Sequence, residues 1–570
     1  MVLKVVLSIK LKNFINMNET NKQTNLLVLA SGAGTRNALF TYNNALPKCL
    51  MSIGDKTCIE AIIDAYDGKV DKVYIALQNC HAKPVDAILK FKGYSNYEIV
   101  SFEPTTTPME SVQEAFKQII GYANDNWFLN WSDVFVNKMT ETFEMPTIIC
   151  DKQYRHRNLA YMHKSNNDSN FSECIVATTS DSKGNVAGIF YVDGKDLQKI
   201  LATMDNSVDF DVLLARNCQC NIHYMSNITD IGDYTKYSEY MQSIKKDNVT
   251  RYFNELEVCS DCVKKRPKTE QGRKLHKIEW DYYRKFSGKA KALARLLGYD
   301  STTMTMSLEK IKGKTCQALV DSKPTQKTKV SEVNRLISEF NEAIATFHEL
   351  PLLDVLDTPE EQHAAVVNEF RTMIDTRVKP CAELIYAVLT TNAIKTVDGM
   401  PISSYADMTS AVDKWLEEKF STDFFDMAIT HGDPNTDNTL YCSSGVKTGI
   451  RFVDPRGYFG KLKTLGLGVK AYDLAKFVYG FSGYGRFNSA EYIAMQIEDN
   501  NINFYVGANE ATGITDVSLF DMKIDDDIRI LVGIIWVKLT SYIINDPMKS
   551  VAAYLHGNAI LTKLLNIPYL

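Results

Sequence analysis

LLVLASGAGTRN, residues 26–37, joins an apolar run to a glycine-rich turn. The run from Leu26 to Ala30 predicts a buried β-strand, and the glycines that follow let backbone N–H groups approach a ligand closely. A strand that leads into such a turn is typical of phosphate sites, because successive backbone N–H groups form an anion-binding concavity. We therefore expect a phosphate compound at this turn.

Two common phosphate-binding motifs do not fit the turn. A P-loop requires Lys-Ser or Lys-Thr after its last glycine, and neither follows Gly34. A dinucleotide fingerprint requires a third glycine where this chain has Asn37. From these residues alone, a plain tight turn stays an open alternative.

The surrounding sequence, from about residue 24 to 240, alternates short apolar runs such as KVYIAL and NWFLNWSD with helical patterns such as MESVQEAFKQII. This alternation predicts an α/β domain over 24–245, with a Rossmann-like, mostly parallel sheet and helices on both faces. Ligands of such sheets bind outside the carboxyl ends of the strands, which is where the turn lies. Residues 1–23 are expected to be an N-terminal extension.

Composition excludes several classes of function. The chain is 45% hydrophobic and 23% charged with a formal net charge of −5, which argues against a nucleic-acid binder. No apolar run reaches the ~20 residues that span a bilayer, so no membrane insertion is expected. Twelve cysteines without framework spacing fit a cytoplasmic protein. Cys259 and Cys262 are expected on one strand, as ordinary thiols and not zinc ligands; the oligomeric state stays open.

LPKCL, at residues 46–50, gives the glycine-rich turn a more specific context. With it, the turn resembles the signature loop of nucleotidylyltransferases that act on sugar phosphates and related phosphates. Three later segments match that family in order: TTTPMESVQEAF from Thr105, FLNWSDVFV and ITDIGDYTKYSEY. Two departures are Ser31, where Ala or Gly is commoner, and DIGD in place of DIGT.

The resemblance implies an NTP substrate (CTP, UTP or another) and Mg²⁺. It assigns catalysis to Arg36 and Lys48, nucleotide contacts to Ala30, Ser31, Gly32, Ala33, Gly34, Thr35, Glu110 and Ser111, and metal binding to Asp133 and Asp230. Arg36 would offer a bidentate fork to pyrophosphate, and Lys48 a compact charge to the α-phosphate. Two carboxylates on Mg²⁺ suit an in-line attack, because the metal offsets charge on the phosphate oxygens.

A second chemical signature lies near the other end of the chain, where HGDPNTDNTL (residues 431–440) precedes GIRFVDPRG (residues 449–457). Phosphoryl transfer requires a carboxylate facing the acceptor hydroxyl and further oxygen ligands on Mg²⁺. The spacing HxDxxxxN supplies Asp433 as the base candidate and Asn438 as a metal ligand, and Asp454, at the end of a predicted strand, is the second metal ligand. His431 is expected to brace the loop.

These strings resemble the aminoglycoside phosphotransferase and choline kinase family, a branch of the protein-kinase-like fold. The resemblance implies an α+β kinase-like domain over 246–570, with a small lobe at about 250–320 and a helical large lobe at about 321–570. It implies ATP contacts from Lys264 or Lys265, from Glu279 as the helix partner of that lysine, and from Glu309 in the hinge strand. No glycine-rich loop over the phosphates is readable.

Together the two signatures predict a bifunctional enzyme acting on small-molecule alcohols and phosphates. The second half would phosphorylate a hydroxyl with ATP, and the first half would transfer NMP from an NTP to the resulting phosphate. A sugar or polyol phosphate is favoured, which would yield an NDP-activated precursor of a surface polysaccharide or lipid. The alternatives are a choline kinase and phosphocholine cytidylyltransferase that makes CDP-choline, and a protein with one inactive half serving as a nucleotide-binding scaffold.

Overall fold

The computed structural model describes residues 22–32, 45–151, 160–162, 174–176, 185–203, 208–218, 220–246, 254–443, 448–507, 513–515 and 517–570. Residues 22–32 and 46–240 belong to one compact unit, and residues 241–570 to a second. The division falls inside a helix, a few residues before the boundary expected at 245.

The first half of the chain contains β1 (Thr24–Leu29), η1 (Lys48–Leu50), α3 (Cys58–Ala65), β2 (Lys72–Gln78), α4 (Asn79–Phe91), β3 (Tyr97–Phe102), α5 (Pro108–Gln118), η2 (Tyr122–Asn124), β4 (Asn126–Trp131), β5 (Val134–Val136), β6 (Thr147–Asp151), β7 (Ala160–Met162), β8 (Cys174–Val176), β9 (Asn185–Asp193), α6 (Gly194–Ala202), α7 (Phe210–Asn217), β10 (Asn221–Met225), β11 (Ile228–Asp230) and α8 (Tyr234–Lys246).

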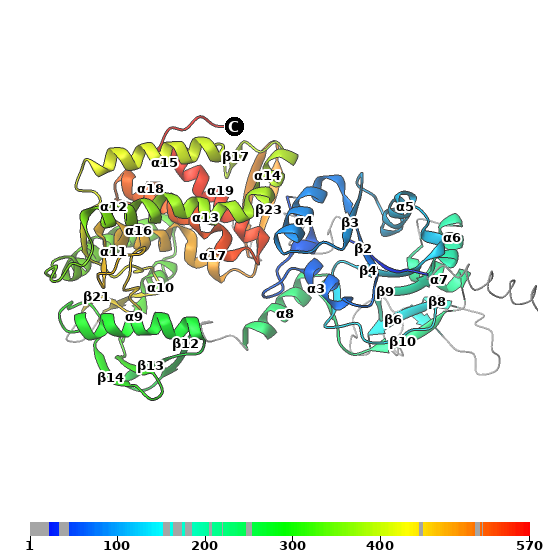
Figure 1. Cartoon of the computed structure of the whole chain (residues 1–570), viewed down its shortest axis with the longest axis horizontal. Coiled ribbons are helices and arrows are strands. Elements are labelled where there is room, and N and C mark those ends of the chain that lie inside the picture. Colours follow the sequence, from blue (N-terminus) through cyan, green and yellow to red (C-terminus); the bar gives the residue numbers. More distant parts are fainter. Residues whose placement is uncertain are drawn as a thin grey trace, which may run out of the picture. The chain divides into compact units, whose positions relative to one another are not determined.

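Seven of these strands form one sheet in the order β10-β6-β9-β4-β1-β2-β3 (Figure 1). The strands β3, β2, β1 and β4 are parallel to one another, whereas β9 is antiparallel to both of its neighbours. The chain moves from β1 outward to β3 and then returns to β4 on the other side of β1. This mixed, mostly parallel sheet confirms the α/β fold expected for the first half.

Both faces of the sheet are covered, as alternate residues of β1 show. Leu27 and Leu29 belong to a core formed with α5, α6 and α7. Leu26 and Val28 point the other way and are also fully buried. Helix α3 precedes β2, and helix α4 connects β2 to β3. Connections between parallel strands are right-handed, so these two helices lie on one face of the sheet. The chain then turns back from β3 to β4, and the same rule places α5 on the opposite face. Burial on both faces explains why β1 is a continuous apolar run.

The second half contains β12 (Asn254–Val258), β13 (Cys262–Pro267), α9 (Glu270–Phe286), β14 (Leu296–Asp300), β15 (Thr305–Glu309), β16 (Lys314–Thr315), α10 (Cys316–Asp321), α11 (Gln326–His348), α12 (Pro359–Val367), η3 (Asn368–Thr372), α13 (Met373–Val378), η4 (Lys379–Cys381), α14 (Ala382–Thr391), β17 (Thr396–Val397), β18 (Met400–Pro401), α15 (Tyr405–Phe420), β19 (Met427–Ile429), β20 (Thr439–Cys442), β21 (Gly449–Phe452), β22 (Leu467–Val469), α16 (Lys470–Tyr479), η5 (Gly480–Tyr484), α17 (Gly485–Ser489), β23 (Ile493–Glu498), β24 (Asn501–Val506), η6 (Leu519–Asp521), α18 (Asp526–Leu539), η7 (Thr540–Ile543) and α19 (Pro547–Leu564).

The second unit begins with an antiparallel sheet in the order β12-β13-β15-β14, and α9 follows β13. Strands β12 and β13 form a hairpin, with the backbone N–H of Cys259 donating to the carbonyl of Cys262 at 2.9 Å. The expectation that these two cysteines lie on one strand was therefore wrong, because a turn separates them. No group of three or more metal-binding side chains occurs among the described residues.

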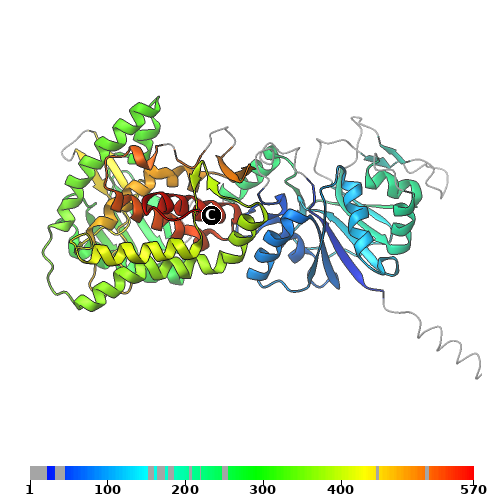
Figure 2. The same cartoon turned by 90° about the horizontal axis from the view of Figure 1, so that it is seen from above.

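The rest of the second unit is mainly helical, with short two- to four-stranded sheets between the helices. The helices α18 and α19, drawn in red, pack side by side, and nearly all of α19 is buried (Figures 1 and 2). Within the described residues, no helix combines the length and apolar character required to cross a bilayer. The kinase-like fold expected for residues 246–570 stays a prediction.

Candidate active sites

The chain leaves β1 beside the end of β4. Leu29 of β1 pairs with Trp131 of β4, and the backbone N–H of Ser132 donates to the carbonyl of Leu29 at 3.1 Å. Ser31 and Gly32 therefore emerge from the same edge as Asp133. Because the chain winds in opposite directions from β1 and from β4, this edge is a topological switch point, where α/β sheets bind ligands.

Asp133 and Asp230, far apart in sequence, are held together by a small ladder. Strands β5 and β11 are antiparallel, with Asp230 opposite Val134, and the N–H of Ile231 donates to the carbonyl of Asp133 at 2.9 Å. The same ladder thus carries both carboxylates. Both are hard oxygen donors of the kind that Mg²⁺ prefers, so the donor set fits the metal expected from the sequence.

A lysine contacts each of these carboxylates. Lys48, in the short helix η1, lies 2.7 Å from Asp133 and donates to the carbonyl of Gly232 at 2.9 Å. Lys236 pairs with Asp230, whose other oxygen accepts the N–H of Gly232 at 2.7 Å. No role was predicted for Lys236 from the sequence, although its position six residues after Asp230, in the first turn of α8, is readable from the helical pattern.

A cavity of about 480 Å³ opens at this edge. Its wall contains the predicted residues Ser31, Gly32, Lys48, Ser111 and Asp133. It also contains residues for which no individual role was predicted, although all but Asp209 lie in the matching segments: Thr105, Thr106, Thr107, Trp131, Ser132, Asp209 and Gly232. The hydroxyl groups of Thr105 and Ser111 are 2.6 Å apart. Hydroxyl groups and one lysine make this a polar site for a ligand with several oxygen atoms.

Two of the other predicted nucleotide contacts, Ala30 and Glu110, do not line the cavity. Ala30 is buried at the end of β1 and its backbone N–H donates to Ala76. The carboxylate of Glu110 accepts the N–H and the hydroxyl of Thr106, at 2.7 and 2.8 Å, so it shapes the loop that lines the cavity. Ala33, Gly34, Thr35 and Arg36 lie outside the described residues.

In the second unit, a buried carboxylate holds the loop that begins with His431, Gly432 and Asp433, which we call the HGD loop. Asp473 of α16 is fully buried and accepts the backbone N–H groups of His431 and Gly432, at 3.0 and 2.8 Å, on separate oxygens. His431 Nε2 lies 3.0 Å from the carbonyl of Val453, which makes Nε2 the protonated nitrogen. Burial lowers the pKa of His431, so the ring is neutral. His431 therefore ties the loop to the next strand.

Asp433 is partly exposed and lies 2.9 Å from the ammonium group of Lys476. Although burial opposes ionisation, the charge and hydrogen bond of Lys476 and the charge of Arg456 hold the pKa of Asp433 below its usual range. An ionised carboxylate can accept the proton of a hydroxyl group. Asn438 donates from its amide nitrogen to the carbonyl of Asp433 at 2.9 Å, which leaves the amide oxygen as its acceptor end.

The structure distinguishes between the two lysines of β13. Lys265 is buried; it lies 2.6 Å from Glu279 of α9 and also pairs with Asp454. Lys264 lies 3.5 Å from Glu257 on the exposed side of the hairpin. Asp454 has a left-handed backbone (φ 61°), and its N–H is held by the hydroxyl of Tyr283 at 3.1 Å. A lysine, a helix carboxylate and a loop carboxylate thus meet.

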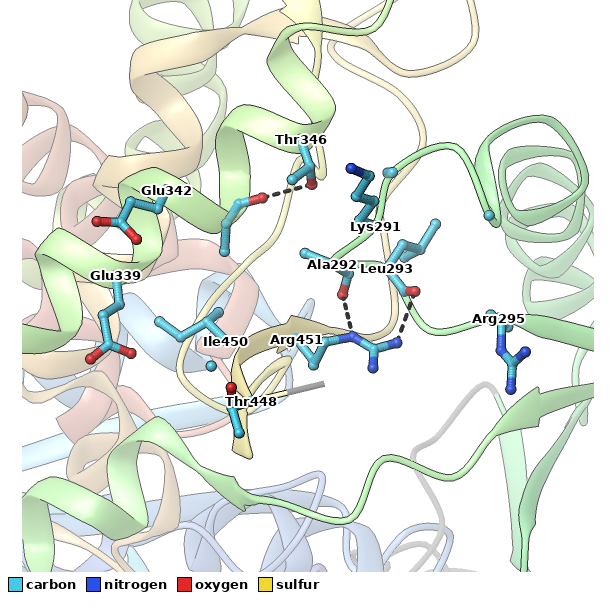
Figure 3. Close-up of a pocket in the computed structure, with 14 residues that line it drawn as sticks. Lys291, Ala292, Leu293, Arg295, Glu339, Glu342, Thr346, Thr448, Ile450 and Arg451 are labelled. Atoms are coloured by element: carbon cyan, nitrogen blue, oxygen red, sulfur yellow. Dashed lines mark hydrogen bonds between the residues drawn. The ribbon is translucent and has the colours of Figure 1, made fainter. Parts of the chain in front are cut away.

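Glu309 does not join this group. It ends β15, and its carboxylate forms an ion pair with Arg451 at 3.0 Å. Arg451 also donates to the carbonyl groups of Ala292 and Leu293, beside a cavity of about 590 Å³ that contains none of the predicted site residues (Figure 3). Because the guanidinium of Arg451 is already bound to protein oxygens, we interpret these contacts as structural.

No protein-family model matches the chain, and no curated protein matches it. Among solved structures, one described as a glucose-1-phosphate thymidylyltransferase from Bacillus anthracis is 14% identical, with 40% of this chain and 98% of that chain covered and a TM-score of 0.33. A nucleoside-diphosphate-sugar pyrophosphorylase from Vibrio cholerae is 12% identical, with coverage of 38% and 99% and a TM-score of 0.30. An inositol-1-phosphate CTP transferase from T. maritima is 12% identical, with 40% of this chain and 97% of that chain covered and a TM-score of 0.28. These are proteins to which part of this chain is similar.

Proposed function

We propose that the protein is a transferase with two active centres. The first unit transfers NMP from an NTP to a sugar or polyol phosphate and releases pyrophosphate. The second unit makes that phosphate, by moving the γ-phosphoryl group of ATP to a hydroxyl group. The product is an NDP-activated precursor for a surface polysaccharide or lipid.

The first activity is supported by the polar cavity at the switch point of the sheet: Lys48 and Asp133 line it, and the ladder of β5 and β11 holds Asp230 next to Asp133. In the reaction, an oxygen of the incoming phosphate forms a bond to the α-phosphorus as the bond to the pyrophosphate oxygen breaks. Lys48 offsets the charge on the phosphate oxygens. Asp133 and Asp230 would hold Mg²⁺, which supplies Lewis-acid stabilisation of the triphosphate.

The second activity is supported by the meeting of Lys265, Glu279 and Asp454 and by the fixed loop that carries Asp433. Asp433 accepts the proton of the acceptor hydroxyl, whose oxygen bonds to the γ-phosphorus as the bond to ADP breaks. Lys265, positioned by Glu279, neutralises the nucleotide phosphates. Asn438 and Asp454 would hold Mg²⁺ through their side-chain oxygens, and the metal would offset the negative charge of the phosphates.

Two alternatives make different predictions. A CDP-choline route requires choline as the acceptor of the second centre and CTP as the nucleotide of the first. A scaffold with one silent half requires that one of the two reactions be absent even with the correct substrates.

The test measures both reactions separately in the full-length protein. Pyrophosphate release is assayed with each NTP and a panel of phosphorylated sugars, polyols and choline, and it should disappear in Asp133→Ala. ADP release with the unphosphorylated compounds should disappear in Asp433→Ala but persist in Asp437→Ala, an exposed residue of the same loop. If no mixture gives pyrophosphate above the Asp133→Ala blank, the transferase assignment is wrong. Loss of both activities in either single variant contradicts two separate centres.

A further inference from the structure

A cluster of charged side chains extends from Asp433 into the helical part of the second unit. Lys476 of α16 pairs with Asp433, and Arg456, just after β21, lies near Glu369 of η3. Lys538 of α18 pairs with the same Glu369. We call these five residues the charged cluster. It lies beside the proposed base, the group that has to face the acceptor hydroxyl.

The backbone fixes Arg456 next to the HGD loop. Its N–H donates to the carbonyl of His431 at 2.9 Å. Gly432 has a left-handed backbone (φ 81°), and a Cβ built on it would lie 3.0 Å from Cβ of Arg456. The backbone of Arg456 is therefore in close contact with the loop that carries Asp433, and the charge of Arg456 acts on the Asp433 carboxylate.

Cations outnumber carboxylates in the charged cluster. Lys476 balances Asp433, and Lys538 balances Glu369, whose pKa stays below its usual range despite burial because Lys538 and Arg456 are close. This leaves Arg456. Its carboxylate partner is the Glu369 oxygen that Lys538 already binds, and the distance of 3.6 Å is longer than a hydrogen bond.

The exposure of the cluster identifies the group that a ligand can reach. The side chains of Glu369 and Lys538 are 5% and 10% exposed, whereas that of Arg456 is 27% exposed and that of Asp433 is 34% exposed. The guanidinium carbon of Arg456 lies 4.4 Å from the centre of the Tyr458 ring. The side chain of Arg456 is also hydrogen-bonded to Tyr458. A guanidinium has further N–H groups, which can bind a planar or tetrahedral oxyanion.

We propose that the hydroxyl substrate of the second centre carries an anionic group, a carboxylate or a phosphate, which Arg456 binds while Asp433 faces the hydroxyl. This rests on the phosphotransferase activity proposed above and specifies its substrate class. An acid sugar or a phosphorylated polyol meets the requirement. A cationic alcohol such as choline would instead place its charge beside the surplus cation, which is unfavourable in a partly buried site.

Binding measurements test the substrate class without turnover. The full-length protein, with Mg²⁺ and a non-hydrolysable ATP analogue, is titrated by calorimetry with glycerol, glycerate, glycerol 3-phosphate and choline. We expect glycerate or glycerol 3-phosphate to bind about tenfold or more tightly than glycerol, with choline the weakest. Comparison of the two anions distinguishes a carboxylate site from a phosphate site. Equal affinity for glycerol and both anions, or tighter binding of choline, overturns the proposal.

Variants locate the effect. Arg456→Gln should remove the preference for the anion, and Arg456→Lys should keep part of it, while the affinity for the ATP analogue is unchanged. The double variant Glu369→Gln with Lys538→Met preserves the charge balance and should keep the preference, which controls for a general disturbance of the fold. Lys470→Met, on an exposed lysine of the same helix as Lys476, should change nothing. If Arg456→Gln lowers the affinities for glycerol and for glycerate by the same factor, Arg456 does not bind the anion.

ADP release with the same compounds separates this proposal from the one on which it rests. Turnover of glycerol or choline that is faster than turnover of both anions, and lost in Asp433→Ala, overturns the anionic substrate but keeps the phosphotransferase. Absence of turnover together with tenfold tighter binding of an anion overturns the phosphotransferase but keeps the anion site.

Discussion

Replacement of Asp473 by asparagine should loosen the HGD loop and thereby reduce activity of the second centre alone. The two oxygens of Asp473 accept two backbone N–H groups. The oxygen that accepts the N–H of His431 also lies 3.1 Å from Nε2 of His348. Asparagine has one acceptor oxygen and one amide nitrogen. Whichever way the amide turns, one buried N–H of His431 or Gly432 faces another donor.

The cost follows from these contacts. An unsatisfied buried donor costs roughly 1–3 kcal/mol, and loss of the charge weakens the hydrogen bond that persists, so Asp473→Asn should lower the free energy of unfolding of the second unit by about 2–4 kcal/mol. Because the same loop carries Asp433, acceptor-stimulated ADP release should fall about tenfold or more, while pyrophosphate release by the first unit is unchanged. Asp473→Ala leaves every donor unpaired and should cost more.

Hydrogen exchange in urea, followed by mass spectrometry of peptides from the second unit, measures the change in stability. Asp426→Asn is the matched control, because Asp426 is 55% exposed and its contact with Lys470 is 3.3 Å long. That change should stay within about 0.5 kcal/mol, as expected of surface substitutions. If Asp473→Asn matches the control in stability and in ADP release, the interpretation of Asp473 as the support of the loop is wrong.

Three further changes test other contacts. Lys48→Met should reduce pyrophosphate release about 100-fold or more, since it removes a charge aimed at the phosphates and leaves Asp133 without its lysine; ADP release should be unaffected. Lys265→Ala should abolish ADP release, whereas Lys264→Ala should keep it within about twofold, because the latter lysine forms an exposed pair; equal effects would contradict the distinction. Gly194→Ala would place a Cβ 2.2 Å from a backbone carbonyl oxygen of η2, so thermal unfolding of the first unit should show a loss of about 1–3 kcal/mol.

The sheet of the first unit was readable from the sequence because burial on both faces leaves a clear signal. Runs such as Leu26 to Ala30 are apolar throughout, and turn residues separate them from helices with a different period. Strand order could not be read. The antiparallel insertion of β9 between β4 and β6 depends on pairing across distant segments, which leaves no periodic pattern in any one of them.

Site residues were readable where a motif fixes their spacing, and were missed where tertiary contacts bring them together. The HxDxxxxN spacing indicated Asp433 and Asn438. Nothing local distinguishes Lys476 or Lys538 from other helical lysines, because their role depends on carboxylates more than 40 residues away. The hairpin at Cys259 was missed because a two-residue turn of Ser and Asp contains no glycine to mark it.

Both proposed centres share an electrostatic design although they lie in different units of the chain. Each carboxylate proposed to bind a metal or to face a hydroxyl forms an ion pair with a lysine: Asp133 with Lys48, Asp230 with Lys236, Asp433 with Lys476, and Asp454 with Lys265. Neighbouring carboxylates repel one another when no cation lies between them, and partial burial makes that repulsion more costly. The lysines offset it in the ligand-free protein.

In the proposed reactions a nucleotide would bring additional negative charge, and the same lysines would then offset the charge of its phosphates. A lysine side chain suits this exchange of partners better than arginine, because its flexible stem carries a compact charge without a fixed bidentate geometry. Arg456 is the exception in the second centre, and it is also the cation whose nearest carboxylate contact is longer than a hydrogen bond. The residue types thus follow the proposed roles: lysines where a charge has to change partners, and a rigid guanidinium where one anionic group has to be recognised in a fixed orientation.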